Sequence, residues 1–214
     1  MITFEVDLRG HLMPIRDQGK RQTCLAFAAS DAHAMKQSRP MSNLSVEYAH
    51  YSACKRMPQF QPANGTTSDA MFDALRLDGQ PPEQEWPYLT ALPTDLTNYH
   101  PPAVVSGLMR HAGEHLHSLD EAEAALKSGW PVIMGLTLSD SFYRLASGTV
   151  LQADPVIVGA RRHAVLGVGL FSTASGTGFL IRNSWGNKWA DSGYGLLSKS
   201  YVEPRTNFLG VYRV

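Results

Sequence analysis

The sequence lacks the features that mark several special classes of protein. It has only two cysteines in 214 residues, too few for a disulfide framework. Its 19 Lys and Arg balance 19 Asp and Glu, so no long-range field favours nucleic acid or an anionic membrane. Its longest apolar stretches, at 130–138 and 164–171, fall far short of the roughly 20 residues of a membrane helix. We expect a soluble globular protein whose partner is a protein, a peptide or a small molecule.

We expect no secretory signal at the amino terminus. Four charged residues, Asp7, Arg9, Arg16 and Asp17, interrupt any apolar run long enough for the hydrophobic region of a signal peptide. We therefore expect no Sec-type export. The chain also has no internal repeat, low-complexity tract or block of like charge, and its length fits one domain or two small lobes that share an interface.

Helical patterns occupy the first half of the chain. An alanine-rich run that starts at Cys24 and stops before Pro40 predicts a helix, with Thr23 as its N-cap. A second helix is expected after Asn43, where apolar side chains recur at helical spacing. A third is expected over 68–77, where a glycine follows to end it.

Strand patterns dominate the second half. Ser118 and Glu121 form a capping box before one last short helix, which Gly129 ends. Strand-like runs then follow at 131–138, 163–171, 178–184, 193–199 and 208–214. Their close spacing and their Gly, Ser and Asn breaks predict an antiparallel sheet or barrel. The fold class is therefore α+β, with a helical lobe, a β lobe and a cleft between them as the expected place for chemistry.

Cys24 is the sharpest chemical feature. At the first turn of a helix, unpaired N–H groups and the helix dipole stabilise a thiolate, which favours a nucleophile. The alternative is a small buried hydrophobic residue, because free cysteine is among the most buried residue types. Position alone leaves both interpretations open, so the surrounding sequence must decide.

Three blocks of sequence occur in an informative order. PIRDQGKRQTCLAF places Gln18 six residues before Cys24, RHAVLGVG places His163 at the start of a predicted strand, and FLIRNSWGNKWADSGYG places Asn183 before Ser-Trp-Gly. These blocks resemble the active-site segments of papain-like cysteine peptidases, and the resemblance spans almost the whole chain. It implies one catalytic domain over 1–214.

The resemblance also implies how that domain is built. A helical lobe at about 10–110 would carry the cysteine, and a β lobe at about 111–214 would carry the histidine and the asparagine. The active-site cleft would lie between them, and the N-terminal strand would cross to the second lobe. No metal and no organic cofactor are implied.

The resemblance assigns four catalytic roles. Cys24 would be the nucleophile and His163 the general base and acid, since a thiol must lose its proton before it attacks a carbonyl. Asn183 would orient the imidazole, as the third member of a triad does. Gln18 would donate its side-chain N–H to the oxyanion, together with the backbone N–H of Cys24.

Five further residues are implied in substrate binding. Asn64, Gly65 and Thr66 would offer backbone groups to an extended peptide. Trp185 would shield the Asn–His hydrogen bond from water, and Trp189 would line the leaving-group side of the cleft. The remaining histidines are expected at the surface: His11, His33, His50, His100, His111, His115 and His117.

The sequence departs from the resembled family at several positions. Arg21 and Ala63 stand where secreted members have a pair of disulfide-bonded cysteines, so we expect no disulfide and a free, buried Cys54, as a reducing compartment permits. Thr66 replaces a glycine of the substrate loop, and Arg162 replaces the acidic residue often found before the histidine. Arg162 would depress the pKa of the imidazolium by like-charge repulsion, an effect that solvent screens.

Leu25 also replaces the tryptophan that usually follows the nucleophile. A last departure is the short segment before residue 7. The Asp-Leu-Arg at 7–9, which resembles the start of mature enzymes, follows only six residues, where family zymogens carry a long inhibitory prosegment. This departure leaves three alternatives: the chain is active as synthesised, a prosegment was removed from it, or a proteinaceous inhibitor or immunity protein restrains it. We expect a monomer that is cytoplasmic as encoded or delivered by a non-Sec secretion route.

The residues leave three functions open. The main prediction is a thiol peptidase that acts on a peptide or protein substrate through an acyl-enzyme. The first alternative is a cysteine-dependent acyltransferase or deamidase that modifies a partner protein, because the triad does not choose the group that resolves the acyl-enzyme. The second is an inactive, peptidase-like binding module, against which the intact set of Gln18, Cys24, His163 and Asn183 argues.

Overall fold

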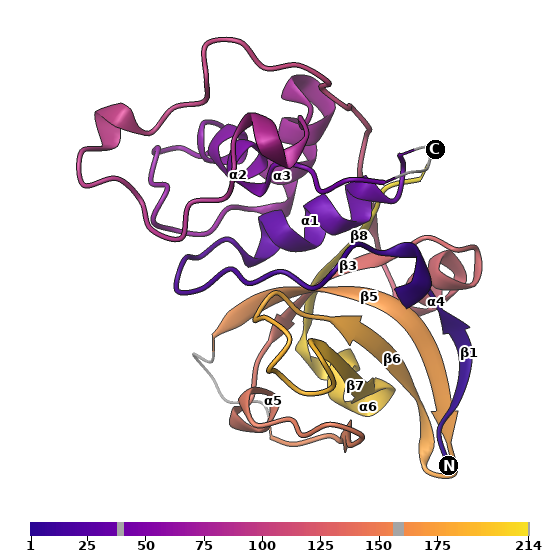
Figure 1. Cartoon of the computed structure of the whole chain (residues 1–214). Helices are drawn as coiled ribbons and strands as arrows, with labels where there is room; N and C mark the ends of the chain where they lie inside the picture. Colours follow the sequence, from indigo (N-terminus) through magenta and orange to yellow (C-terminus); the bar gives the residue numbers. More distant parts are fainter. Residues whose placement is uncertain (38–40, 156–160, 214) are drawn as a thin grey trace.

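Helices α1 (Cys24–Ala34), α2 (Val46–Cys54) and α3 (Ser68–Asp73) lie in the upper lobe in Figure 1, above a twisted sheet. The computed structural model describes residues 1–37, 41–155 and 161–213. Helix α3 continues into a π-helical turn at Ala74–Asp78. Short 3-10 turns lie at Arg9–His11, Glu83–Glu85, Leu96–Asn98 and Glu203–Arg205. The helices predicted from the sequence are confirmed, and Gly79, at φ 81°, ends the third.

The sheet of the lower lobe has the strand order β2-β8-β3-β5-β6-β7-β4, with β1 paired to β5. Its strands are β1 (Thr3–Asp7), β2 (Glu114–Leu116), β3 (Val132–Thr137), β4 (Val150–Leu151), β5 (Arg162–Thr173), β6 (Gly176–Arg182), β7 (Tyr194–Ser198) and β8 (Thr206–Val211). The short helices α4 (Leu119–Lys127), α5 (Asp140–Tyr143) and α6 (Lys199–Val202) belong to the same half of the sequence. All pairings except β4 with β7 are antiparallel, which confirms the predicted α+β class.

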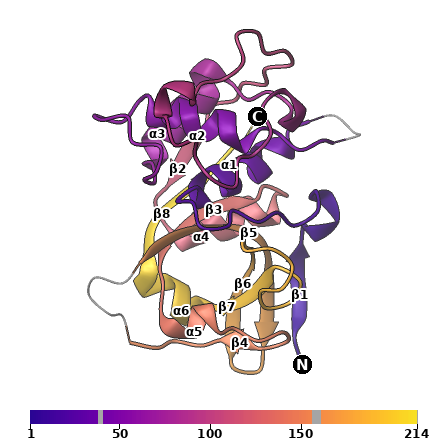
Figure 2. The ribbon, with the colours of Figure 1, turned by 60° about the vertical axis from the view of Figure 1, so that its left-hand side comes forward.

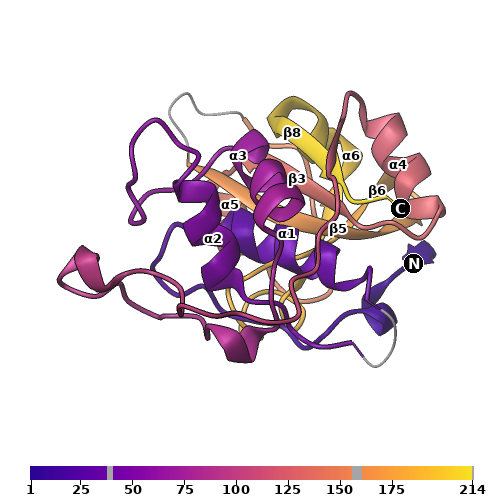
Figure 3. The ribbon, with the colours of Figure 1, turned by 90° about the horizontal axis from the view of Figure 1, so that it is seen from above.

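Both ends of the chain cross between the lobes. The first strand, β1, pairs antiparallel with β5 and lies at the side of the sheet in Figure 2. At the other end, Tyr212 follows β8 and packs against His33 of α1 and Phe72 of α3. The predicted crossing of the N-terminal strand is confirmed. Seen from above, α2 and α4 lie on opposite sides of the molecule (Figure 3).

Helix α1 lies at the centre of the molecule. Every residue from Leu25 to Ala34 is buried, because α2 and α3 cover the helix on one side and β5 on another. A helix buried all round needs apolar and small residues all round, which the alanine-rich run supplies. Asp31 on this helix binds Arg182 of β6 and Arg16, with N–O distances of 2.6 Å. These ion pairs attach the helix to the strand that ends next to Asn183.

Two local predictions are corrected and one is confirmed in part. Thr23 occupies the N-cap position of α1, but its hydroxyl pairs with Tyr88 at 2.8 Å instead of capping the helix. His33 and His50 are not at the surface; they are 0% and 1% exposed and bind polar partners inside the helical lobe. The serine half of the capping box is confirmed, since the Ser118 hydroxyl accepts from the Glu121 N–H at 3.1 Å, but the Glu121 carboxylate accepts the His117 N–H at 2.9 Å and not that of Ser118.

Candidate active site

Cys24 is the first residue of α1 and its side chain is half-buried. The first hydrogen bond of the helix, from Phe27 N–H to Thr23 C=O, leaves the preceding N–H groups unused by the helix. The backbone N–H groups of Leu25 and Ala164 hydrogen-bond to the thiol and favour its anion. The helix start and the edge of the sheet therefore meet at this sulfur.

His163 and Asn183 come together because their strands are neighbours. His163 is the second residue of β5, and Asn183 follows β6, which pairs with β5. The imidazole Nε2 lies 2.7 Å from Asn183 Oδ1, which also accepts the Ser184 N–H at 2.8 Å. Because an amide oxygen only accepts, Nε2 carries the proton and Nδ1 is left as the basic nitrogen.

Burial disfavours the charged forms of both the Cys24 thiol and the His163 imidazole. It raises the pKa of the Cys24 thiol and outweighs the N–H donors around it. It lowers the pKa of His163 to about 4, although the bond to Asn183 acts the other way. The N–H groups of the helix start favour the thiolate, as expected, but burial acts against it and is the larger effect. An ion pair between the two groups must draw its stability from their mutual attraction.

Gln18 lies in the loop before α1 and is 6% exposed. Its Nε2 donates to Arg21 C=O at 2.7 Å, and its Oε1 accepts from the Ser184 hydroxyl at 2.7 Å. Since an amide nitrogen has two N–H groups, one remains for a further acceptor. Ser184 also accepts the Gln18 backbone N–H, at 2.8 Å, so it couples Gln18 to Asn183. The sequence reasoning missed this serine, although it lies within the Asn-Ser-Trp motif.

The two tryptophans occupy different positions. The Trp185 ring lies 4.6 Å from the His163 ring between centroids, so the indole covers the imidazole. Tyr143 stacks on its other side at 5.3 Å, with 12° between the planes. Trp189 is 8% exposed and donates its N–H to Phe142 C=O at 3.2 Å. It packs against Trp185 and Phe142 and is not among the residues that line the two clefts described below.

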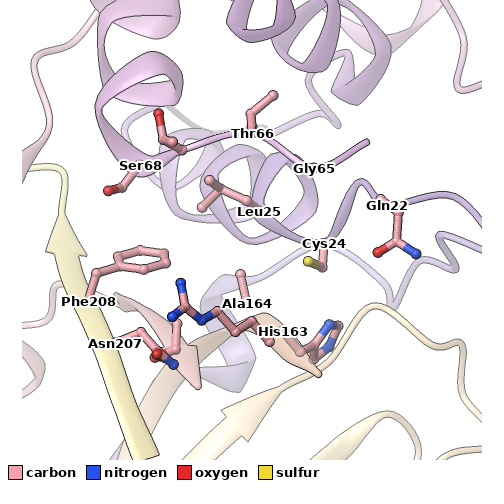
Figure 4. A pocket seen from close by; sticks show the side chains of 13 residues that line it. Gln22, Cys24, Leu25, Gly65, Thr66, Ser68, His163, Ala164, Asn207 and Phe208 are labelled. Atoms are coloured by element: carbon pink, nitrogen blue, oxygen red, sulfur yellow. Dashed lines mark hydrogen bonds between the residues drawn. The ribbon is translucent and has the colours of Figure 1, made fainter. Parts of the chain in front are cut away.

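Two connected clefts meet at His163. We call the first the apolar subcleft, of about 360 Å³, where Cys24, Leu25, Gly65 and Thr66 of the helical lobe face Ala164, Phe208 and the imidazole of the β lobe (Figure 4). Gly135 permits this shape, because a Cβ there would lie 2.2 Å from the Phe208 ring. Asn64, predicted to bind substrate, does not line the apolar subcleft; its amide binds Gln61.

We call the second the basic subcleft, of about 590 Å³. It is lined by Gln18, by the imidazole, by Trp185 and Tyr143, and by several cations.

Among the described residues, no group of three or more His, Cys, Asp or Glu is placed to hold a metal ion. In those same stretches of chain, no helix is long and apolar enough to cross a membrane. The site therefore offers a thiol, an imidazole and amide donors for chemistry.

Comparisons with known proteins identify the family of this chain. The model of the papain family cysteine proteases matches residues 2–207. Digestive cysteine proteinase 2 of Homarus americanus is 25% identical over 98% of this chain and 64% of its own length. Cysteine proteinase 3 of Entamoeba histolytica is 27% identical over 91% of this chain and 62% of its own. The chain thus spans less than two thirds of these curated relatives.

Solved structures share the fold. Xylellain, a cysteine protease from Xylella fastidiosa, has a TM-score of 0.77 at 22% identity, over 100% of this chain and 87% of that one. A chain from a structural study of the mite allergens Blo t 1 and Der p 1 has a TM-score of 0.80 at 22% identity, over 97% of this chain and 70% of that one. With the family model covering nearly its whole length, this chain belongs to the papain family of cysteine proteases.

Proposed function

We propose that the chain is a thiol peptidase in which Cys24, His163 and Asn183 form the triad. The observation that carries the proposal is the alignment of groups from both lobes at one cleft. Cys24 and His163 line the same subcleft, and the imidazole is held by Asn183 at 2.7 Å. Each group comes from a different element, so only the folded chain assembles them.

The proposed reaction uses His163 as both base and acid. Its Nδ1 takes the thiol proton, and the Cys24 sulfur attacks the peptide carbonyl to form a tetrahedral intermediate. The free N–H of Gln18 Nε2 and the Cys24 backbone N–H stabilise the oxyanion. The imidazolium then protonates the leaving amine, and water resolves the acyl-enzyme by the reverse sequence.

The environment supports this division of labour. Burial disfavours the Cys24 thiolate and the His163 imidazolium when each is charged alone. The same exclusion of water strengthens the attraction between the two charges, and this attraction would stabilise the pair. Trp185 covers the imidazole and excludes water from its bond to Asn183. Gly65 and Thr66 would hold the acyl part of an extended peptide by backbone hydrogen bonds.

Further features extend the proposal. The chain would act as one catalytic domain and as a monomer on peptide or protein substrates. A proteinaceous inhibitor or immunity protein would restrain it in a cell that makes it. It would work in the cytoplasm or after delivery by a non-Sec route.

Product masses test the proposed reaction. Wild-type protein and Cys24→Ala are incubated with a denatured protein substrate, and the products are weighed by mass spectrometry. Peptidase activity yields two fragments whose masses sum to the substrate plus one water, and Cys24→Ala yields none. A mass gain from conjugation, or a shift of about one dalton from deamidation, would show that another group or bond is used.

Cys54→Ala is the matched control. Cys54 is 1% exposed, and burial raises the pKa of its thiol to about 12. Its loss should leave the fragments unchanged. Fragments that survive in Cys24→Ala and vanish in Cys54→Ala would overturn the assignment.

A further inference from the structure

The basic subcleft is rich in cations and has no acid in its lining. Its described lining includes Lys20, Arg21, Arg161 and Arg162, and no Asp or Glu. Arg21 is neutralised, because it is 8% exposed and binds the buried Glu47 at 2.6 Å. The other three cations are exposed, and none forms an ion pair with the described residues.

This surplus is local to the subcleft. The whole chain has balanced charge, and the segments at 38–40 and 156–160 contain no Asp or Glu that could neutralise the subcleft. Elsewhere on the described surface, some cations are paired, as Arg76 is with Asp73 and Lys199 with Glu123, whereas others, such as Lys55 and Lys188, form no ion pair with the described residues. Three unpaired cations that line one cleft, with no acid in its described lining, give that cleft a positive potential.

The subcleft also lies on a defined side of the reacting groups. Arg162 and His163 line both subclefts, so a peptide that passes His163 runs from one subcleft to the other. Gly65 and Thr66 would bind the acyl part of the substrate in the apolar subcleft, as proposed above. The basic subcleft then receives the residues that leave with the amine.

We propose that the basic subcleft selects peptides with Asp or Glu side chains in the first residues after the scissile bond. This inference rests on the proposed peptidase function and names its substrate class. The stacked Tyr143 and Trp185 give the floor an apolar surface on which the methylene groups of a glutamate can lie, with Tyr143 43% exposed. Each exposed cation should favour an acidic residue by about two- to fivefold.

Cleavage statistics on a complex peptide mixture test the selection. A proteome-derived peptide library is digested with wild type and with the triple variant Lys20→Gln, Arg161→Gln, Arg162→Gln. The frequency of Asp and Glu at the first three positions after each cleaved bond is divided by its frequency in the library. This ratio is internal to each protein, so it does not depend on how fast a variant works.

Lys55→Gln is the matched control, because Lys55 is an exposed cation on the helical lobe that lines neither subcleft. We expect acidic residues to be enriched about fivefold or more by wild type and by Lys55→Gln, and little by the triple variant. The wild-type enrichment should also fall between about 50 mM and 500 mM salt, because exposed charges are screened.

The outcomes separate the two proposals. Cleavage without acidic enrichment in wild type, enrichment that survives in the triple variant, or enrichment that ignores salt would overturn the selection and leave the peptidase standing. An absence of cleavage by wild type would overturn the peptidase and the selection together. The salt series uses wild type alone, so it tests the selection of acidic residues even if the triple variant does not fold.

Discussion

The two lobes hold their shares of the active site by different means. The helical lobe fixes the loop before Cys24 with buried charge: Arg21 binds Glu47, whose side chain is 0% exposed. The same carboxylate accepts the Leu89 N–H at 2.9 Å and the Tyr99 hydroxyl at 2.5 Å. The β lobe holds its histidine on β5 and its asparagine just after β6 mainly by backbone pairing and apolar packing, with one buried ion pair from Arg182 to Asp31 of α1.

The difference shows how a fold can replace a covalent link. Arg21 stands where the resembled secreted peptidases have a disulfide-bonded cysteine, and here it joins the same loop to α2 through Glu47. An ion pair needs no oxidising compartment, but each buried charge depends on the other, because removing one leaves the other without compensation. Removing one apolar side chain from a packed core leaves no uncompensated charge on its neighbours. Changes in the two lobes should therefore differ in size and in their effect on catalysis.

Glu47→Ala should produce the largest effect. It leaves the Arg21 guanidinium buried and unpaired, so we expect a loss of about 4 kcal/mol in the free energy of unfolding. Urea titration measures the loss. The folded enzyme should also have a lower kcat, because Arg21 C=O binds Gln18 Nε2.

The double variant Arg21→Met, Glu47→Leu is the control for this prediction. It removes both charges and keeps apolar volume, so it should be more stable than Glu47→Ala. Equal losses in the two proteins would mean that the charges do not hold the lobe together.

Leu197→Ala should rank second. This side chain is 0% exposed in β7, and its loss leaves a cavity that should reduce the free energy of unfolding by about 3 kcal/mol. The kcat of the folded fraction should be unchanged, because Leu197 lines neither subcleft. Urea titration and active-site titration together measure both quantities. Leu197→Met keeps the volume and should cost less than 1.5 kcal/mol, or about half of the alanine loss. An equal loss in both variants would argue against a packing effect.

Acid should destabilise both lobes, because burial lowers the pKa of His163 in the β lobe and of His33 in the helical lobe, and His33 lies outside the candidate site. His33 binds Gln80 at 2.9 Å and His111 at 3.0 Å, and burial lowers its pKa to about 4. The unfolded histidine, with a pKa near 6.5, takes a proton more readily, so stability falls as the pH drops from about 6.5 toward 4. Burial lowers the pKa of His50 in the same lobe, with the same sign. We expect His33 to account for about 2 kcal/mol between pH 7 and pH 5.

Comparison of wild type with His33→Gln measures this contribution. Gln keeps polar atoms near Gln80 but does not titrate, so its urea midpoint should depend less steeply on pH. Lys36 and His111 are the charged neighbours of His33, and they remain in the variant. An unchanged pH slope would remove His33 as a source of acid sensitivity.

Much of the fold could be predicted from local sequence. Helix starts with capping residues, such as Ser118, and apolar runs, such as 163–171, carry their signal within a few residues. The burial of His33 and His50 could not be predicted in this way, because their partners lie elsewhere in the sequence. Thr23 had a capping residue type, but a tertiary contact with Tyr88 took its hydroxyl.

The candidate site divides in the same way. Cys24, His163 and Asn183 could be proposed from motifs whose spacing is itself the signal. The pairing of Arg21 with Glu47 joins positions 26 residues apart, and no pattern in the sequence marks it. The position of Trp189 behind Trp185 depends on the packing of α5, through Phe142, which the sequence did not reveal.

The two cysteines differ in place: Cys24 lies where both lobes meet, and Cys54 is buried at the end of α2. Treatment with a thiol-directed epoxide, followed by peptide mass mapping, tests this most directly. We expect stoichiometric labelling of Cys24 and none of Cys54, which is buried and has a raised pKa. In the His163→Ala variant, the epoxide should label Cys24 far more slowly, because this variant lacks the imidazole that would take the thiol proton. Slow and equal labelling of both cysteines in wild type would contradict the account.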